Sequence, residues 1–117
     1  MPLRDANVGI GPLGTVVATT LLSFPAWAVE VEVEGHTVVP LDTFACTDMP
    51  RSSWMRTICC DEDARYMLMR QRDTWHHFCA IDGETVAGLI AAPSVGGSYH
   101  ANVEGRFDCE EDLIPEY

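Results

Sequence analysis

The stretch SSWMRTICCDEDARYMLMRQRDTWHHFCAI, residues 52–81, decides the fold. It contains three runs rich in β-branched, aromatic and sulfur-containing residues, at 52–60, 66–70 and 74–81, with polar turns at 61–63 and 71–73. Runs of this length bounded by turn residues are typical of strands, and connections this short join antiparallel neighbours. The sequence therefore predicts a three-stranded antiparallel meander in which Met55 and Ile58 are buried.

One helix is predicted after the meander. Asp82 can cap a helix over residues 83–92, and Pro93 ends it. The apolar residues Val86, Leu89 and Ile90 recur at the spacing that buries one helical face. We expect this helix to cover the sheet.

The C-terminal part is predicted to be short and mostly irregular. Residues 94–97 are predicted as a turn, with Ser94 as the cap of a helical turn that contains Tyr99 and Val103 and ends at Gly105. The chain is then expected to run extended to Cys109. Residues 110–117 form an acidic tail that we expect to be disordered.

A hairpin is predicted before the meander. The valines Val29, Val31 and Val33 alternate with glutamates, which is the period of a half-buried strand, and a glycine turn then leads to a second strand at 37–39. The segment 41–50 is polar and is predicted as a loop. The fold class is therefore α+β: a small antiparallel β-meander covered by one helix, with a short C-terminal helical turn and an N-terminal β-hairpin.

Residues 1–28 have the pattern of a secretory signal peptide. Arg4 precedes an apolar run over 8–24, and Ala26-Trp27-Ala28 is the small-x-small pattern of a cleavage site. One alternative is a transmembrane anchor, for which the run is shorter than the required stretch of about 20 apolar residues. The other alternative is a cytosolic start of unusual composition. We expect cleavage after Ala28 and a periplasmic or secreted mature protein with no membrane span.

The composition is strongly acidic, with a net charge of −11, and all 7 basic residues are arginines. Arg4 and Asp5 would be removed together, so maturation leaves the net charge unchanged. The other arginines are scattered along the sequence and form no basic stripe. Binding to nucleic acid or to an anionic membrane is therefore not expected. We interpret the acidity as a source of solubility and not as a dedicated acidic docking face.

Several landmarks occur in order between residues 52 and 107. They are Ser52-Ser53, Met55, Ile58 and Asp61 at the start, Leu89, Ala92, Ser94 and Gly96 in the middle, and Tyr99, Asn102-Val103 and Gly105-Arg106-Phe107 at the end. In this order they resemble the KTSC domain, a module found at the C-terminus of some lysyl-tRNA synthetases and alone in bacterial proteins. The KTSC-like domain would span 51–109, after the hairpin and loop of 29–50. The resemblance implies RNA binding only by analogy with the synthetases, and the charge of this chain does not favour it.

The centre of the segment departs from the family. His76-His77-Phe78 stands where the family has tyrosine-x-tyrosine, and Cys60 stands where a tyrosine often precedes the aspartate. Four cysteines occupy positions similar to those of exported single-domain members: Cys46, Cys59, Cys79 and Cys109. The resemblance therefore favours the exported members.

All 5 cysteines follow the predicted cleavage site, as expected for disulfides that form in an oxidising compartment. In the meander, Cys59 and Cys79 end the two outer strands, about 9 to 10 Å apart, which is too far for a disulfide. We therefore predict the pairs Cys79–Cys109 and Cys46–Cys59. Cys60 is the extra thiol, and three states remain open for it: burial, a bond to another chain, or a vicinal bond to Cys59.

Neither a metal site nor a catalytic motif is predicted. The candidate zinc ligands are His76, His77 and Cys79, with His36, His100 or a carboxylate to complete the site. Successive residues of a strand point to opposite faces, and no recognised zinc spacing occurs. The serines lie in no nucleophile elbow, and the adjacent cysteines lack the spacing of thiol oxidoreductases. We therefore expect a protein that is not an enzyme and needs no cofactor.

The leading hypothesis is an exported, non-catalytic binding module. Its partner is unknown, and a protein is the first class of partner that we consider. The candidate binding residues offer large contact areas with polar tips, and they are Trp75, His76, Phe78, Ser94, Tyr99, His100 and Asn102. One alternative is a metal-binding or redox-responsive envelope protein that uses the histidines and Cys60. The other is an RNA-binding module, by family analogy.

Overall fold

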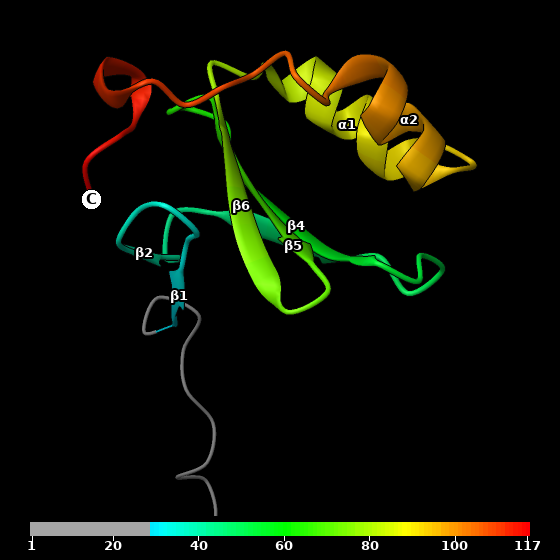
Figure 1. Ribbon diagram of the computed structural model, residues 1–117, viewed down its shortest axis with the longest axis horizontal. Helices are drawn as coiled ribbons and strands as arrows, with labels where there is room; N and C mark the ends of the chain where they lie inside the picture. The colour runs from blue at the N-terminus through cyan, green and yellow to red at the C-terminus, as the bar shows by residue number, and fades with distance from the viewer. Residues whose placement is uncertain (1–28) are drawn as a thin grey trace, which may run out of the picture.

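The computed structural model describes residues 29–117, so the predicted signal peptide lies outside the described residues. These residues form an α+β fold with two antiparallel sheets and two α-helices (Figure 1). The elements are β1 (Glu30–Glu32), β2 (Val38–Pro40), β3 (Ala45–Asp48), β4 (Met55–Asp61), β5 (Tyr66–Gln71), β6 (Thr74–Cys79), α1 (Gly83–Ala91), α2 (Val95–Asn102) and the 3-10 helix η3 (Glu111–Leu113). The predicted fold class and the N-terminal hairpin β1–β2 are confirmed.

The larger sheet has the strand order β3-β4-β5-β6, and each neighbouring pair is antiparallel. β5 lies between its sequence neighbours, with Leu68 opposite Cys59 on one side and His77 on the other. The two residues Arg72-Asp73 join β5 to β6, and Arg72 adopts a positive φ of 56°. Because sequential antiparallel strands joined by short loops make a meander, that prediction is confirmed.

The larger sheet also contains β3, which the sequence analysis missed. β3 lies within the predicted loop 41–50 and pairs with β4, so that Cys46 faces Cys59 and Asp48 faces Thr57. All four residues of β3 are exposed, so no alternation of buried and exposed positions marks the strand. The prediction of an irregular loop is wrong because β3 is held by its pairing with β4 and not by burial of its own side chains.

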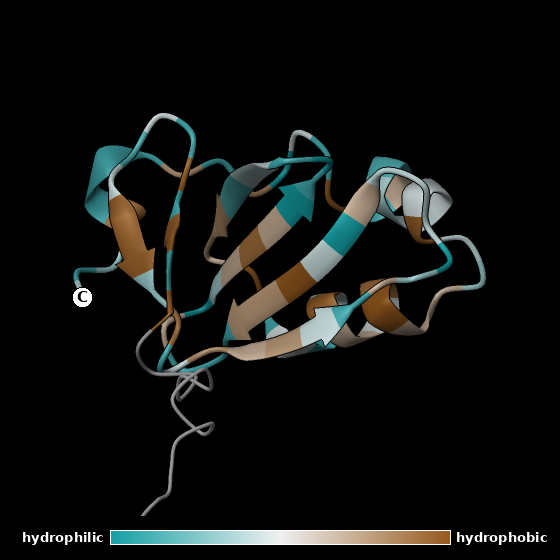
Figure 2. Cartoon of the chain, turned by 90° about the horizontal axis from the view of Figure 1, so that it is seen from below, coloured by the Kyte–Doolittle hydropathy of each residue, from teal (hydrophilic) through white to brown (hydrophobic). Residues whose placement is uncertain are grey.

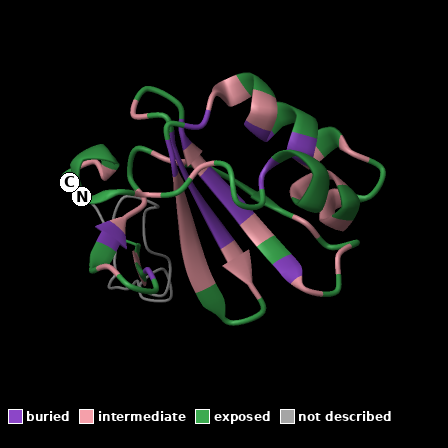
Figure 3. Ribbon diagram, turned by 45° about the horizontal axis from the view of Figure 1, so that its top comes forward, coloured by how far each residue is buried: buried purple, intermediate pink, exposed green. Residues whose placement is uncertain are grey.

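Both faces of the larger sheet are covered (Figure 1). β5 is buried at four consecutive positions, Tyr66 to Met69, as expected for a strand that packs on two sides. On the helix side, α1 and α2 cover a core of Met55, Ile58, Met67, Met69, Ile81, Val86, Leu89 and Val103. On the hairpin side, β1–β2 and the C-terminal segment cover Val33, Val39, Cys59, Tyr66, Leu68 and Cys79. Figure 2 shows apolar residues recurring along the strands, and Figure 3 shows buried residues gathered in the central strands.

The two helices begin at side-chain caps. Asp82 Oδ2 accepts a hydrogen bond from Thr85 N at 3.2 Å and caps α1, as predicted. Ser94 Oγ accepts from Gly97 N at 3.1 Å and caps α2. The predicted Ser94 cap is therefore confirmed, whereas the separate turn predicted at 94–97 is wrong, because residues 95–97 are the first turn of the helix itself. Helix α1 packs beside α2, so the helix side carries two helices where the sequence predicted one and a short turn.

The C-terminal tail packs onto the domain. After η3, Ile114 contacts the hairpin-side core, and the Tyr117 hydroxyl donates to Asp61 Oδ2 at 2.9 Å. The Tyr117 ring also lies 5.5 Å from the Phe44 ring, measured between centroids. The expected disorder of residues 110–117 is therefore wrong. An apolar and an aromatic residue interrupt the acidic composition and fix the tail.

Two disulfides brace the domain, and both predicted pairs are confirmed. Cys46 is bonded to Cys59, and Cys79 is bonded to Cys109. Cys60 is a free, half-buried thiol, so the vicinal bond does not form. Disulfides persist in oxidising compartments, so this bonding fits an extracellular or periplasmic protein. Within residues 29–117, no helix is long and apolar enough to cross a membrane.

Candidate binding site at the Trp54 cleft

A cleft of about 420 Å³ lies between the segment 47–54, which enters β4, and the junction of α1 with α2. We call it the Trp54 cleft. Its lining consists of Thr47, Asp48, Met49, Pro50, Arg51, Ser52, Ser53, Trp54, Ile90, Ala92, Pro93, Ser94, Val95 and Gly96. This lining combines apolar side chains with hydroxyls, one arginine and one aspartate, a mixture that suits recognition of an amphipathic group.

Local hydrogen bonds hold Trp54 in the wall of the cleft. Ser52 Oγ accepts from Met55 N at 3.0 Å, which orders the turn before β4, and Arg72 N donates to Trp54 O at 2.6 Å. The indole also lies close to α2, since a Cβ at Gly96 would stand 3.4 Å from indole atoms Cζ2 and Nε1. A glycine at position 96 therefore allows the ring to pack directly against the helix backbone.

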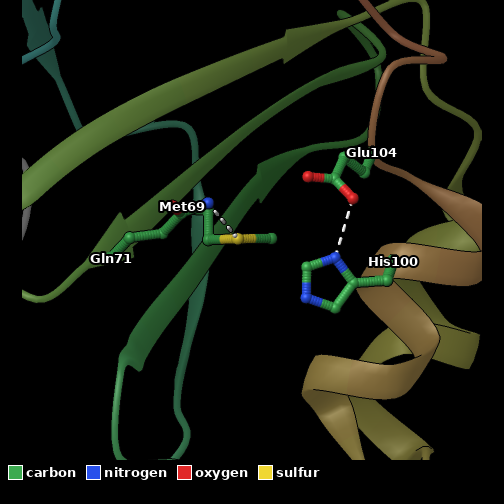
Figure 4. A network of polar contacts seen from close by, with 4 residues as sticks. All are labelled: Met69, Gln71, His100 and Glu104. Atoms are coloured by element: carbon green, nitrogen blue, oxygen red, sulfur yellow. Dashed lines mark hydrogen bonds and ion pairs between the residues drawn. The ribbon is translucent and has the colours of Figure 1, made fainter.

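An aromatic cluster continues from Trp54 across α2. The Tyr99 ring lies edge-on to Trp54 at 5.7 Å, and the His100 ring stacks on Trp54 at 6.0 Å, both measured between centroids. The Phe78 ring of β6 lies edge-on to Tyr99, at 6.1 Å between centroids. His100 Nδ1 lies 2.7 Å from Glu104 Oε1, and Figure 4 shows this pair beside α2. The carboxylate thus fixes the orientation of the imidazole that faces Trp54.

The structure brings together part of the predicted binding set. Phe78, Tyr99 and His100 belong to the aromatic cluster, and Ser94 lines the cleft. Asn102 is exposed and donates to Ser98 Oγ at 3.4 Å, outside the cleft lining. Trp54 is the central residue that the sequence analysis missed. It lies within the run 52–60 that was predicted as a strand, and that pattern gave no sign that its side chain would meet α2.

The other two predicted residues lie elsewhere. Trp75 packs against the hairpin-side core, and its carbonyl accepts from Glu34 N at 2.9 Å. His76 Nδ1 pairs with Glu34 Oε1 at 3.2 Å. Both residues therefore help to attach the β1–β2 hairpin to the edge of β6, and the predicted binding strand is split between two sites.

A second hollow of about 370 Å³ adjoins the cleft, and we call it the arginine hollow. It is lined by Asp48, Met49, Pro50, Ser52, Arg56, Thr57 and Arg70. Four of these residues, Asp48, Met49, Pro50 and Ser52, also line the Trp54 cleft. Arginines that are scattered in the sequence meet here because the strand register places Arg70 opposite Thr57, next to Arg56.

A third hollow of about 650 Å³ lies between the hairpin and the C-terminal segment, with His36, Val39, Cys109, Ile114 and Tyr117 in its lining. Beneath it, Tyr66 Oη and His77 Nδ1 are 2.8 Å apart, and the His77 ring stacks on His36 at 5.4 Å between centroids. These contacts join the hairpin to the sheet through polar rings. We assign them a structural role.

Burial shifts the titration of these groups. It raises the pKa of Tyr66 to about 12. The pKa of Tyr117 is raised further, by burial and then by its hydrogen bond to the Asp61 carboxylate. The pKa of His77 is lowered by burial and then by repulsion from the His36 and His76 imidazoles. All three groups are therefore held in their neutral forms near neutral pH.

The residues considered for metal or redox chemistry are dispersed. Cys79 is bonded in a disulfide and cannot act as a ligand. Cys60 packs on the helix side of the sheet, whereas His77 lies on the hairpin side. Within residues 29–117, no group of three or more histidine, cysteine or acidic side chains could hold a metal ion. Burial, followed by repulsion from Glu62 and Asp61, raises the pKa of Cys60, which disfavours its thiolate.

A scan against protein-family models finds no match to this chain, and no match is found among the curated proteins or the solved structures.

Proposed function

We propose that this chain is a small exported, non-catalytic binding module of the KTSC type, and that its partner binds at the Trp54 cleft. The observation that carries the proposal is the aromatic cluster of Trp54, Tyr99 and His100 beside an open cleft. Aromatic side chains with polar tips dominate binding hot spots because they bury large areas at a small entropic cost.

The serine hydroxyls in the cleft support a binding role. Ser52 Oγ accepts from the backbone N–H of Met55, and Ser94 Oγ accepts from that of Gly97. Each hydroxyl therefore caps local structure and is not oriented by a histidine, as a nucleophile would be. The two disulfides support export, because they stabilise a small domain in an oxidising compartment.

Site-specific photo-cross-linking in the native envelope tests the proposal. A photoreactive residue in place of Ser53, which is exposed and lines the cleft, should give a discrete cross-linked species. Trp54→Ala should abolish that species, because it removes the central side chain of the cluster. A probe at Ala87, exposed on α1 and outside the lining, is the matched control. Equal yields from both probes, unaffected by Trp54→Ala, would refute binding at the cleft.

A further inference from the structure

Three arginines of an acidic molecule line two adjoining hollows. Arg51 lines the Trp54 cleft, and Arg56 and Arg70 line the arginine hollow, whereas the chain as a whole has 18 acidic residues against 7 basic ones. Among residues 29–117, Arg51 and Arg56 have no carboxylate within ion-pair distance. Arg70 pairs only with Asp73, whose side chain is 93% exposed, and such pairs contribute little. Asp48 is the carboxylate in the lining of both hollows, and its Oδ1 accepts a hydrogen bond from Thr57 Oγ1 at 3.0 Å and pairs with none of these arginines. The guanidinium groups are thus able to bind an anionic ligand.

The two hollows lie on opposite faces of the same sheet edge. The Trp54 cleft is on the helix side, where Trp54, Ile90 and Val95 pack against the helix-side core. The arginine hollow is on the hairpin side, because Arg70 is directly opposite Trp75, which belongs to the hairpin-side core. Their shared rim consists of Asp48, the last residue of β3, and Met49, Pro50 and Ser52, which follow it.

The outer edge of β3 has no partner strand among the described residues. Met49 N donates to Arg56 O in β4, so alternation along the strand turns the backbone groups of Cys46 and Asp48 away from β4. An extended chain could pair with these groups as a fifth strand. Its side chains would then alternate between the two faces of the sheet, and hence between the two hollows.

We propose that β3 binds an extended peptide segment of a partner protein in which apolar and acidic side chains alternate. The apolar side chains enter the Trp54 cleft, and the acidic side chains enter the arginine hollow, where Arg56 on β4 is the nearer arginine. The partner's backbone hydrogen bonds to β3. This inference rests on the proposed function, whose cleft it uses, and it adds the chemistry and the conformation of the partner.

The direct test uses a short, capped, fluorescently labelled peptide of alternating valine and glutamate and the folded, oxidised domain. Fluorescence anisotropy should show saturable binding. Replacing glutamate by lysine in the peptide should abolish binding, because the arginines then repel it. Methylating alternate backbone nitrogens on the edge that faces β3 should also abolish it, although every side chain is kept. Equal binding of the methylated and unmethylated peptides would refute strand pairing.

A charge reversal in the protein locates the site. Arg56→Glu should weaken peptide binding at least about tenfold, whereas Arg106→Glu, an identical change at an exposed residue outside both hollows, should leave it unchanged. Equal effects of the two variants would mean that only long-range attraction between the protein and the peptide is measured, and would refute binding in the arginine hollow. Binding of inorganic polyphosphate or single-stranded RNA without binding of the peptide would also overturn it. Self-association that Arg56→Glu abolishes would overturn the assignment to a separate partner.

The cross-linking and peptide-binding results together distinguish failure of this inference from failure of the proposed function. If the Ser53 probe gives its Trp54-dependent cross-link but the peptide does not bind, the cleft binds a partner of other chemistry and only this inference falls. If the cross-link is absent as well, the proposed function falls with it.

Discussion

The hydroxyl of Tyr117 donates to Asp61 Oδ2 at 2.9 Å and joins the C-terminal segment to the end of β4, 56 positions earlier in the sequence. Asp61 is only 8% exposed and also accepts from Thr43 Oγ1 at 2.8 Å. A buried carboxylate needs such donors, because an unsatisfied charge in the interior is costly. The tail therefore contributes to the stability of the sheet.

Tyr117→Phe should lower the free energy of unfolding by roughly 1 to 2 kcal/mol, because it removes one hydrogen bond to a buried carboxylate and keeps the ring. Urea denaturation monitored by tryptophan fluorescence measures the change. Glu116→Gln, at the neighbouring exposed residue, is the control and should have almost no effect. An unchanged midpoint for Tyr117→Phe would show that the hydrogen bond contributes nothing.

Stability should fall at alkaline pH because of Tyr66. Its pKa is about 12 in the folded state, against an ordinary value of 10.0, so folding favours the protonated phenol. The corresponding stability is complete below pH 10 and is lost as the pH rises toward 12. Chemical denaturation at pH 9 to 12, compared with Tyr66→Phe, measures it. A wild type no more sensitive to alkali than the variant contradicts the prediction.

His77 should titrate below its ordinary value of 6.5, since burial and the nearby His36 and His76 disfavour its charged form. The stability gained from neutral His77 is present above pH 6.5 and is lost as the pH falls through the folded pKa. NMR titration should show that His36→Asn raises the pKa of His77. His100→Asn, beside Trp54, should leave it unchanged. A His77 pKa at or above 6.5 in the wild type would refute the assignment.

Loss of the Cys79–Cys109 disulfide should destabilise the domain by about 3.5 kcal/mol, because the bond closes 30 positions of chain in the unfolded state. The Cys46–Cys59 bond closes a loop of only 13 positions and should contribute about 3 kcal/mol to the free energy of unfolding. Thermal unfolding of the two paired serine variants measures both. Cys60→Ser is the control, since Cys60 is in neither bond. Peptide mapping that links Cys60 to another cysteine would contradict the pairing.

The sequence predicted the elements whose patterns are local. The meander follows from apolar runs between polar turns, and the Asp82 cap follows from its position before a helical period. The meander excluded a Cys59–Cys79 bond, because a strand separates the two residues, and both predicted pairs are present.

The missed features depend on contacts between distant residues. β3 has no buried side chain and exists because β4 pairs with it. Ser94 caps α2 as predicted, but the helix already includes Gly96 and Gly97, which were predicted as a turn, because Trp54 packs on this part of its backbone. The arginine hollow likewise depends on the register between β4 and β5, which no single segment encodes.

The covering of β5 on both faces has a consequence for how the chain matures. The hairpin-side core includes Cys109 and Ile114, so that face stays partly open to water until the last part of the sequence has been synthesised. During this interval Tyr66 and Leu68 offer an apolar surface that a chaperone could shield. We expect the Cys79–Cys109 bond to form last, and its closure would mark the point at which the nascent chain no longer needs that protection.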